Sequence, residues 1–259
     1  MMKKNLYIIF LIYILLASSC GDSNGVMSSS PDIQSPIGGS GKGGSLARFA
    51  ISNNRLYTIN EFSIKIFDIS NRQDMVFKNE EYIGFGIETL FPVQDKLFVG
   101  AQDAMYIYDI QNPDFPTYLS VYGHFLSCDP VVVQGNYAYV TLRVSECRPS
   151  QSFDALEIID ITNLQEPIQV NTYELDEPYG LGISGDLLFI CEGNNGLKVL
   201  NVADPHNIKL VKQFTGINAY DVIPISNILI LTGKDGIRQY DFSDPENIVQ
   251  ISELYASAG

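Results

Sequence analysis

One short sequence pattern occurs five times along this chain of 259 residues. Each copy is an apolar run of strand length that ends in Asp or Asn, followed by a polar or proline-containing turn. The copies are SIKIFDISN at 63–71, AMYIYDIQNP at 104–113, ALEIIDITN at 155–163, GLKVLNVADP at 196–205 and GIRQYDFSDP at 236–245. A chain built from one repeated unit is confined to repeat architectures, because each unit buries its apolar faces against its neighbours.

The spacing of the repeat selects among these architectures. The residues that occupy the same place in the second strand of each unit are Tyr57, Phe98, Tyr139, Phe189 and Ile230, with steps of 41, 41, 50 and 41. A period near 40 with short apolar runs is typical of propeller blades of four strands, not of helical solenoids. Five such sheets around an axis bury faces that a single sheet leaves bare. We therefore predict an all-β fold, a β-propeller of five four-stranded blades over residues 46–259.

Each unit also carries a two-residue turn between its first and second strands. The predicted turns are Asn53-Asn54, Asp95-Lys96, Gly135-Asn136, Gly185-Asp186 and Ser226-Asn227. Asn, Asp and Gly tolerate the positive φ that tight hairpins require.

The acidic residue of the repeat has two interpretations. The residues at this position are Asp68, Asp109, Asp160, Asn201 and Asp241. Such side chains accept hydrogen bonds from backbone N–H groups of the following turn. A metal-binding or acid–base role is the alternative, but the five positions fall in five different blades. The pattern therefore favours a structural role.

The first 20 residues have the features of an export signal. Lys3 and Lys4 precede an apolar run, Leu6–Leu16, which is short for a membrane span. Small residues then lead to Cys20, and the whole segment resembles a bacterial lipoprotein signal peptide. The resemblance implies removal of residues 1–19 and lipidation of Cys20, palmitate included; an ordinary secretory signal and a short membrane anchor are the alternatives.

Residues 20–45 are predicted to be a flexible tether, since 16 of the 25 residues after Cys20 are Gly, Ser or Pro. The expected location is the cell envelope, held to the membrane by lipid and facing the periplasm or the cell exterior. The net charge of −14 and the absence of a basic run exclude nucleic acid as an expected partner.

Longer segments resemble a known family of repeats. They are GKGGSLARFAI, IETLFP, CDPVVVQGNYAYVTLR, LEIIDITN, YGLGISGDLLFIC and YDVIPI. These segments are similar to the LVIVD-repeat β-propellers of secreted bacterial proteins. The resemblance implies an exported propeller and no established reaction.

The repeats diverge where each innermost strand begins, at the predicted mouth of the central channel. The candidate ligand-binding residues there are Arg48, Glu88, Asp129, Tyr179, Tyr220 and Asp221. This mixture suits a polar ligand, a carbohydrate or a protein segment. No cofactor is expected, and the alternative is Ca²⁺ bound by convergent carboxylates at the mouth. A network in which Arg48 pairs with the acids and fills the channel is the third interpretation.

The same end of the propeller carries an insertion of ten residues, because 51 residues separate Asp109 from Asp160 and 41 separate Asp68 from Asp109. It lies in RVSECRPSQSFDA and contains Arg143 and Arg148, which could meet an anionic group or form a solvated loop.

The remaining cysteines fit an oxidising compartment. Cys128 and Cys147 fall on one face and are predicted to form a disulfide that holds the insertion. Cys191 lies inside a second strand and is predicted to be a buried thiol.

Catalytic motifs are scarce. The two histidines are His206, in a predicted turn, and His124, just before the mouth residues of the third blade. No HExxH, GxSxG, P-loop, CxxC or EF-hand pattern occurs. We therefore predict a non-catalytic binding or scaffold module. The alternative is a carbohydrate-active hydrolase or lyase that uses Glu88, Asp129 or Asp221.

Overall fold

The computed structural model describes residues 45–123, 130–143 and 153–256. Contacts divide the chain into two units, Met1–Pro36 and Ile37–Gly259, and all described residues belong to the second unit. Among these residues, no helix is long and apolar enough to cross a membrane. The sequence-based expectations for Cys20, Cys128, Asp129 and Cys147 lie outside the described residues.

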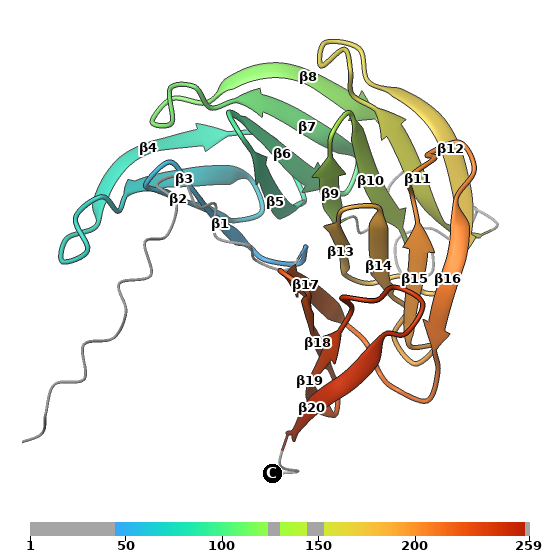
Figure 1. Cartoon of the computed structure of the whole chain (residues 1–259). Coiled ribbons are helices and arrows are strands. Elements are labelled where there is room, and N and C mark those ends of the chain that lie inside the picture. Colours follow the sequence, from blue (N-terminus) through green and yellow to red (C-terminus); the bar gives the residue numbers. More distant parts are fainter. Residues whose placement is uncertain (1–44, 124–129, 144–152, 257–259) are drawn as a thin grey trace, which may run out of the picture. The chain divides into compact units, whose positions relative to one another are not determined.

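Twenty strands form five antiparallel sheets of four strands, which follow one another along the chain (Figure 1). Blade 1 contains β1 (Phe49–Ser52), β2 (Arg55–Ile59), β3 (Ser63–Asp68) and β4 (Val76–Tyr82). Blade 2 contains β5 (Ile87–Val93), β6 (Lys96–Ala101), β7 (Ala104–Asp109) and β8 (Thr117–Gly123). Blade 3 contains β9 (Val131–Gln134), β10 (Tyr137–Leu142), β11 (Asp154–Asp160) and β12 (Ile168–Leu175).

Blade 4 contains β13 (Leu181–Ser184), β14 (Leu187–Cys191), β15 (Leu197–Asn201) and β16 (Lys209–Phe214). Blade 5 contains β17 (Asp221–Ile225), β18 (Ile228–Gly233), β19 (Gly236–Asp241) and β20 (Val249–Tyr255). The predicted all-β fold with five four-stranded blades is confirmed. The insertion in blade 3 falls between β10 and β11, as the spacing indicated.

The inner hairpins have the predicted turns in four blades. In blade 2 the predicted turn Asp95-Lys96 is wrong by one residue, because Val93 pairs with Lys96 and the turn consists of Gln94 and Asp95. Gln94 takes a φ of 53°, the positive value that two-residue hairpins require.

The structural role of the repeated acidic position is confirmed in every blade. Each side chain accepts a hydrogen bond from the backbone N–H two residues later, at 2.8–3.0 Å. The acceptors are Asp68, Asp109, Asp160, Asn201 and Asp241. Hydrogen bonds from the hydroxyl and the N–H of Thr162 lower the pKa of Asp160, and those from the N–H and the hydroxyl of Ser243 lower the pKa of Asp241, because they favour the ionised form.

The core consists of four apolar clusters, and each joins two successive blades. In blades 1 to 4, one aromatic side chain on the second strand packs against the blade that follows. These side chains are Tyr57, Phe98, Tyr139 and Phe189, and each is at most 2% exposed. Burial of large rings between sheets removes much apolar area from water and holds successive blades together.

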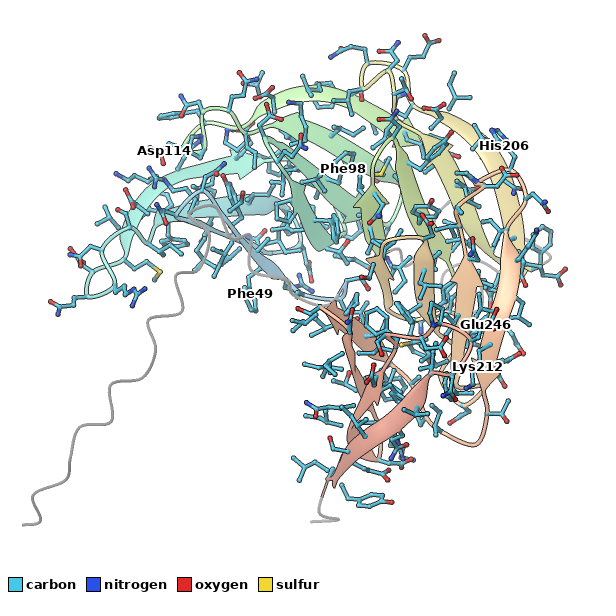
Figure 2. The ribbon with its side chains drawn as sticks, in the orientation of Figure 1. Phe49, Phe98, Asp114, His206, Lys212 and Glu246 are labelled. Carbon is cyan, nitrogen blue, oxygen red and sulfur yellow. The ribbon has the colours of Figure 1, made fainter. Side chains whose placement is uncertain are left out.

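Blades 1 and 5 differ from this pattern on one face each. None of the core clusters formed by the described residues joins blade 5 to blade 1. Five sheets were expected to bury both faces of every blade, but among the described residues no sheet packs against the outward faces of blades 1 and 5, where Phe49 is 53% and Ile237 is 42% exposed. Phe98 lies between neighbouring blades, whereas Phe49 projects from the free side of blade 1 (Figure 2).

Candidate functional site

The structure brings three of the six predicted mouth residues together and leaves two apart. Tyr179, Tyr220 and Asp221 meet where β13 and β17 begin, since the backbone N–H of Gly180 donates to the carbonyl of Tyr220 at 2.8 Å. Glu88 lies on β5, where its carboxylate accepts a hydrogen bond from Gln102 at 3.2 Å. Arg48 precedes β1 and is exposed to solvent. Asp129, the sixth, is outside the described residues.

The two tyrosines, whose ring planes are inclined at 53° to each other, form a cluster with an arginine from blade 3 that is called the stack below. The ring centroids of Tyr179 and Tyr220 lie 5.2 Å apart, and the guanidinium carbon of Arg143 lies 4.3 Å from the centroid of Tyr179. Arg143 follows β10, so residues from three successive blades meet here. The ring face of Tyr179 attracts the cation, and the side chain of Tyr220 remains 37% exposed. An exposed ring beside a guanidinium suits a sugar face or a peptide side chain.

Two glycines allow β13 and β17 to approach closely enough for this contact. A Cβ atom on Gly180 would lie 2.3 Å from a carboxylate oxygen of Asp221, and one on Gly182 would lie 2.7 Å from the Cδ of Pro224. At the equivalent place of Gly182 the other blades have Ala50, Phe91, Val132 and Ile223. The interface of blades 4 and 5 is therefore the one whose inner strands approach through glycine.

Asp221 is partly buried next to Tyr220 and interacts with a residue from before the first blade. The Ser45 hydroxyl donates to Asp221 Oδ1 at 3.4 Å and accepts from the Leu181 N–H at 2.7 Å. The Val222 N–H also donates to Asp221 Oδ1, at 2.9 Å. Burial raises the pKa of Asp221 to about 6. Ser45 is itself buried, a role that the Gly/Ser-rich sequence around it gave no sign of.

A second buried carboxylate at this end was missed by the sequence analysis. Glu192 follows β14, next to the Cys191 carbonyl that accepts from the Tyr179 N–H at 2.7 Å. Its side chain is fully buried, and Oε1 accepts from Lys198 Nζ at 2.6 Å and from the Asp176 N–H at 3.1 Å. Among the described residues, no hydrogen-bond partner reaches its Oε2. The only sequence sign is a lysine six residues after a glutamate.

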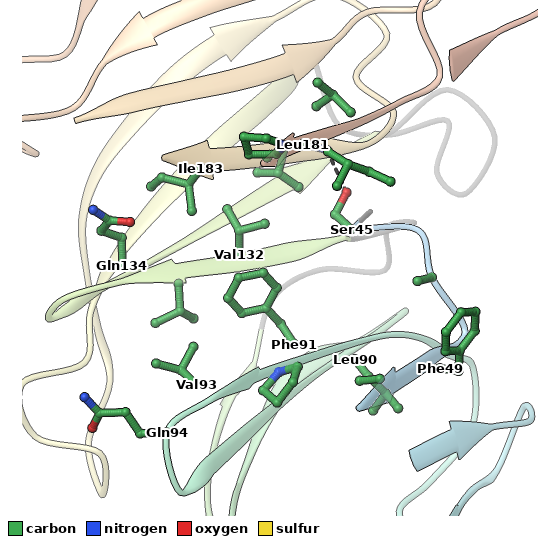
Figure 3. A pocket seen from close by; sticks show the side chains of 18 residues that line it. Ser45, Phe49, Leu90, Phe91, Val93, Gln94, Val132, Gln134, Leu181 and Ile183 are labelled. Atoms are coloured by element: carbon green, nitrogen blue, oxygen red, sulfur yellow. Dashed lines mark hydrogen bonds between the residues drawn. The ribbon is translucent and has the colours of Figure 1, made fainter. Parts of the chain in front are cut away.

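The central pocket is apolar between its two ends. It has a volume of about 250 Å³ and is lined by residues of all five innermost strands, among them Phe91, Val132, Leu181 and Ile183 (Figure 3). Polar lining is confined to Ser45 at one end and to Gln94 and Gln134 at the other (Figure 3). The mixed polar residues of the sequence prediction therefore do not extend down the channel.

Other predicted residues have simple positions. Cys191 is a free thiol with no exposed surface, which confirms its predicted burial, and that burial raises its pKa. His206 is exposed in an exit turn, where its backbone N–H donates to Asp204 at 3.1 Å. His124 and Arg148 lie outside the described residues. In the described part of the chain, no three His, Cys, Asp or Glu side chains gather as a metal site would require.

Comparison with known proteins supports a β-propeller built from a known repeat. The fold is a β-propeller of four-stranded blades, and the family model of the LVIVD repeat matches residues 127–145 and 180–215. The chain therefore carries the LVIVD repeat at these residues, which confirms the type of repeat that its sequence resembles. A search of curated protein sequences gave no match.

Several solved structures share the fold at low sequence identity. A protein of unknown function from Desulfotomaculum acetoxidans has 13% identity and a TM-score of 0.61, with 77% of this chain and 65% of that chain covered. A protein from Lactobacillus plantarum has 14% identity, a TM-score of 0.64 and coverage of 77% and 67%. The periplasmic gluconolactonase of Pseudomonas aeruginosa has 12% identity, a TM-score of 0.59 and the same coverage, 77% and 67%. This chain thus spans about two thirds of the length of these structures, and the likeness concerns the fold alone.

Proposed function

We propose that this protein is a lipid-anchored β-propeller of the cell envelope that binds a carbohydrate or protein ligand without catalysis. The export features before Cys20 and the tether that follows support the anchored location. The observation that carries the binding role is the stack of Arg143, Tyr179 and Tyr220 at the mouth. Loops and strand ends on a rigid scaffold are the usual place of recognition.

The stack has the composition of a recognition surface. A tyrosine ring gives a large contact area at a small cost in conformational entropy, and the hydroxyl adds a hydrogen bond. The backbone of Tyr179 is held by its N–H bond to the Cys191 carbonyl, and its ring is in contact with the Arg143 guanidinium, so the residue is preorganised. Tyr220, which is more exposed, is the side chain that a ligand would meet first.

The carboxylates at the mouth favour binding over hydrolysis. A glycoside hydrolase needs two carboxyl groups that face one open site at a suitable separation. Here Glu88 accepts from Gln102, Glu192 pairs with Lys198, and Asp221 accepts from Ser45. Each of these three groups has a partner within the protein, so the described carboxylates act first as structural acceptors.

A binding screen tests the proposal. Full-length protein in detergent would be screened against arrayed oligosaccharides and peptides, and each hit would be titrated with Tyr179→Ala and Tyr220→Ala. Loss of one stacking contact or hydrogen bond should weaken binding about ten- to a hundredfold. Tyr118→Ala, on the outer strand β8, is the matched control. Full affinity of both mouth variants with unchanged melting temperatures would contradict the proposal.

A further inference from the structure

The two terminal faces of the propeller retain the residue types of buried interfaces. On the side of each blade that faces the next blade, the third strand places an apolar residue at one register position. These residues are Ile64, Met105, Leu156, Leu197 and Ile237. The first four are at most 1% exposed, whereas Ile237 of the last blade is 42% exposed. Ile230 likewise occupies the position of Phe189 and its equivalents but is only partly buried.

The opposite face of blade 1 shows the same difference. The innermost strand of each blade places one apolar residue toward the preceding blade: Phe49, Leu90, Val131, Leu181 and Val222. The last four are at most 4% exposed, whereas Phe49 is 53% exposed. Leu56, Phe67 and Phe77 lie on the same face, and the ring centroids of the two phenylalanines are 5.7 Å apart. We call this the leading face, and the free face of blade 5 with Ile230 and Ile237 the trailing face.

A hydrogen bond that recurs between neighbouring blades has a different partner in blade 5. The outer strand of blades 2 to 4 carries one donor that reaches a backbone carbonyl of the next blade. The pairs are Ser120 with the Leu164 carbonyl, Asn171 with the Pro205 carbonyl at 3.0 Å, and Lys212 with the Ile248 carbonyl at 2.9 Å. Ser252 has the same register position in blade 5, but its hydroxyl donates to Gln239 of its own blade at 2.8 Å.

These observations indicate what kind of structure would cover the two free faces. The trailing and leading faces are the two halves of an interface that the chain builds four times between its own blades. An exposed apolar surface of this kind marks a site of association. We propose that both faces bind further blades of the same repeat, which fill the space from blade 5 to blade 1.

Further blades fit better than a second copy of the whole chain. Contact between the trailing face of one copy and the leading face of another is heterologous and leaves one free face at each end of the pair. A set of blades with its own leading and trailing faces covers both faces of this chain at once. The solved propellers are also longer than the matched region, since this chain covers 65–67% of their length.

The experiment supplies blades directly. Residues 46–123, which form blades 1 and 2, would be appended after Gly259 through a Gly/Ser linker. The appended leading face then meets Ile230 and Ile237, and the appended blade 2 meets Phe49. We expect a higher melting temperature and a severalfold loss of binding of an apolar fluorescent dye. The control extension carries Leu56→Asp and Phe67→Asp in its appended copy and should give neither effect.

A second measurement needs no added blades. In the unextended protein, Ile237→Ser should leave the melting temperature nearly unchanged and reduce dye binding. Leu197→Ser, at the equivalent buried position, should lower the melting temperature strongly. If both variants lowered the melting temperature equally, the trailing face would already be covered, and the proposal would be overturned. Dye binding that disappears as dimers form would assign the face to a second copy instead. A disulfide within one chain between Phe49→Cys and Ile237→Cys would show that blades 1 and 5 close on each other, which also overturns it.

Discussion

At the scale of single residues, the repeated exit turn shows how one side chain can specify a backbone shape. Asp160 accepts from the Thr162 N–H at 2.8 Å, and Asn201 makes the same bond in the next blade at 3.0 Å. We expect Asp160→Asn to retain the turn and Asp160→Ala to lose about 0.5–1.5 kcal/mol of unfolding free energy. Urea unfolding at neutral pH measures both. Asn201→Asp is the matched control, and equal losses from Asp160→Ala and Asp160→Asn would contradict the turn's role.

The partly buried carboxyl of Asp221 gives a prediction about pH. Burial raises the pKa of Asp221 to about 6, above the value near 4 of an unfolded aspartate. The folded protein therefore holds this proton between these pH values, and the contribution of Asp221 to stability is lost as pH rises from about 4 to 6. The loss is at most about 3 kcal/mol.

Asp221→Asn isolates this contribution, because every other titrating group is common to both proteins. The unfolding free energy of wild type minus that of Asp221→Asn should fall from pH 4 to pH 6.5 and then stay level. Urea unfolding across this range gives the difference. A constant difference would mean that Asp221 keeps an ordinary pKa in the folded protein.

At the scale of strands, the approach of β13 to β17 depends on missing side chains. A Cβ atom on Gly182 would lie 2.7 Å from the Cδ of Pro224 and 2.9 Å from the Val222 carbonyl oxygen. Gly182→Ala should therefore force the two inner strands apart and cost about 1–3 kcal/mol of unfolding free energy. Gly123→Ala is the control, since its added Cβ has no atom within 4 Å. Equal stability of the two variants in urea would show that the blades separate without cost.

Elements were predictable where every blade repeats the same local demand. The exit turns depend on one side chain and the backbone two residues away, so sequence alone identified them. The turn at Gln94 was displaced by one residue because both Gln94-Asp95 and Asp95-Lys96 are compatible with a tight turn, and only the pairing of Val93 with Lys96 decides.

The site was less predictable because its contacts cross between blades. Tyr179, Tyr220 and Asp221 were selected for their divergence from the repeat, and they do lie together. The contact of Arg143 with Tyr179 and the burial of Glu192 depend on how blades 3, 4 and 5 pack, which no local pattern encodes. The free terminal faces were missed for the same reason, since a repeat gives the residue type at an interface but not the presence of the neighbour.

At the scale of the whole molecule, the proposed function requires that the propeller be held at a membrane, and lipidation of Cys20 would hold it there. Three acyl chains hold a protein on a membrane durably, whereas one chain gives marginal binding. The surface itself offers little attraction to anionic lipid, because the chain carries a net charge of −14. Cys20→Ala should therefore abolish labelling by a palmitate analogue and either release the body from the membrane fraction or leave the signal peptide uncleaved. Ser18→Ala keeps a small residue before the cysteine and should behave like wild type. Equal labelling of wild type and Cys20→Ala would show that the lipid is attached elsewhere. The protein would then be held at the membrane by its apolar segment or not be held there at all.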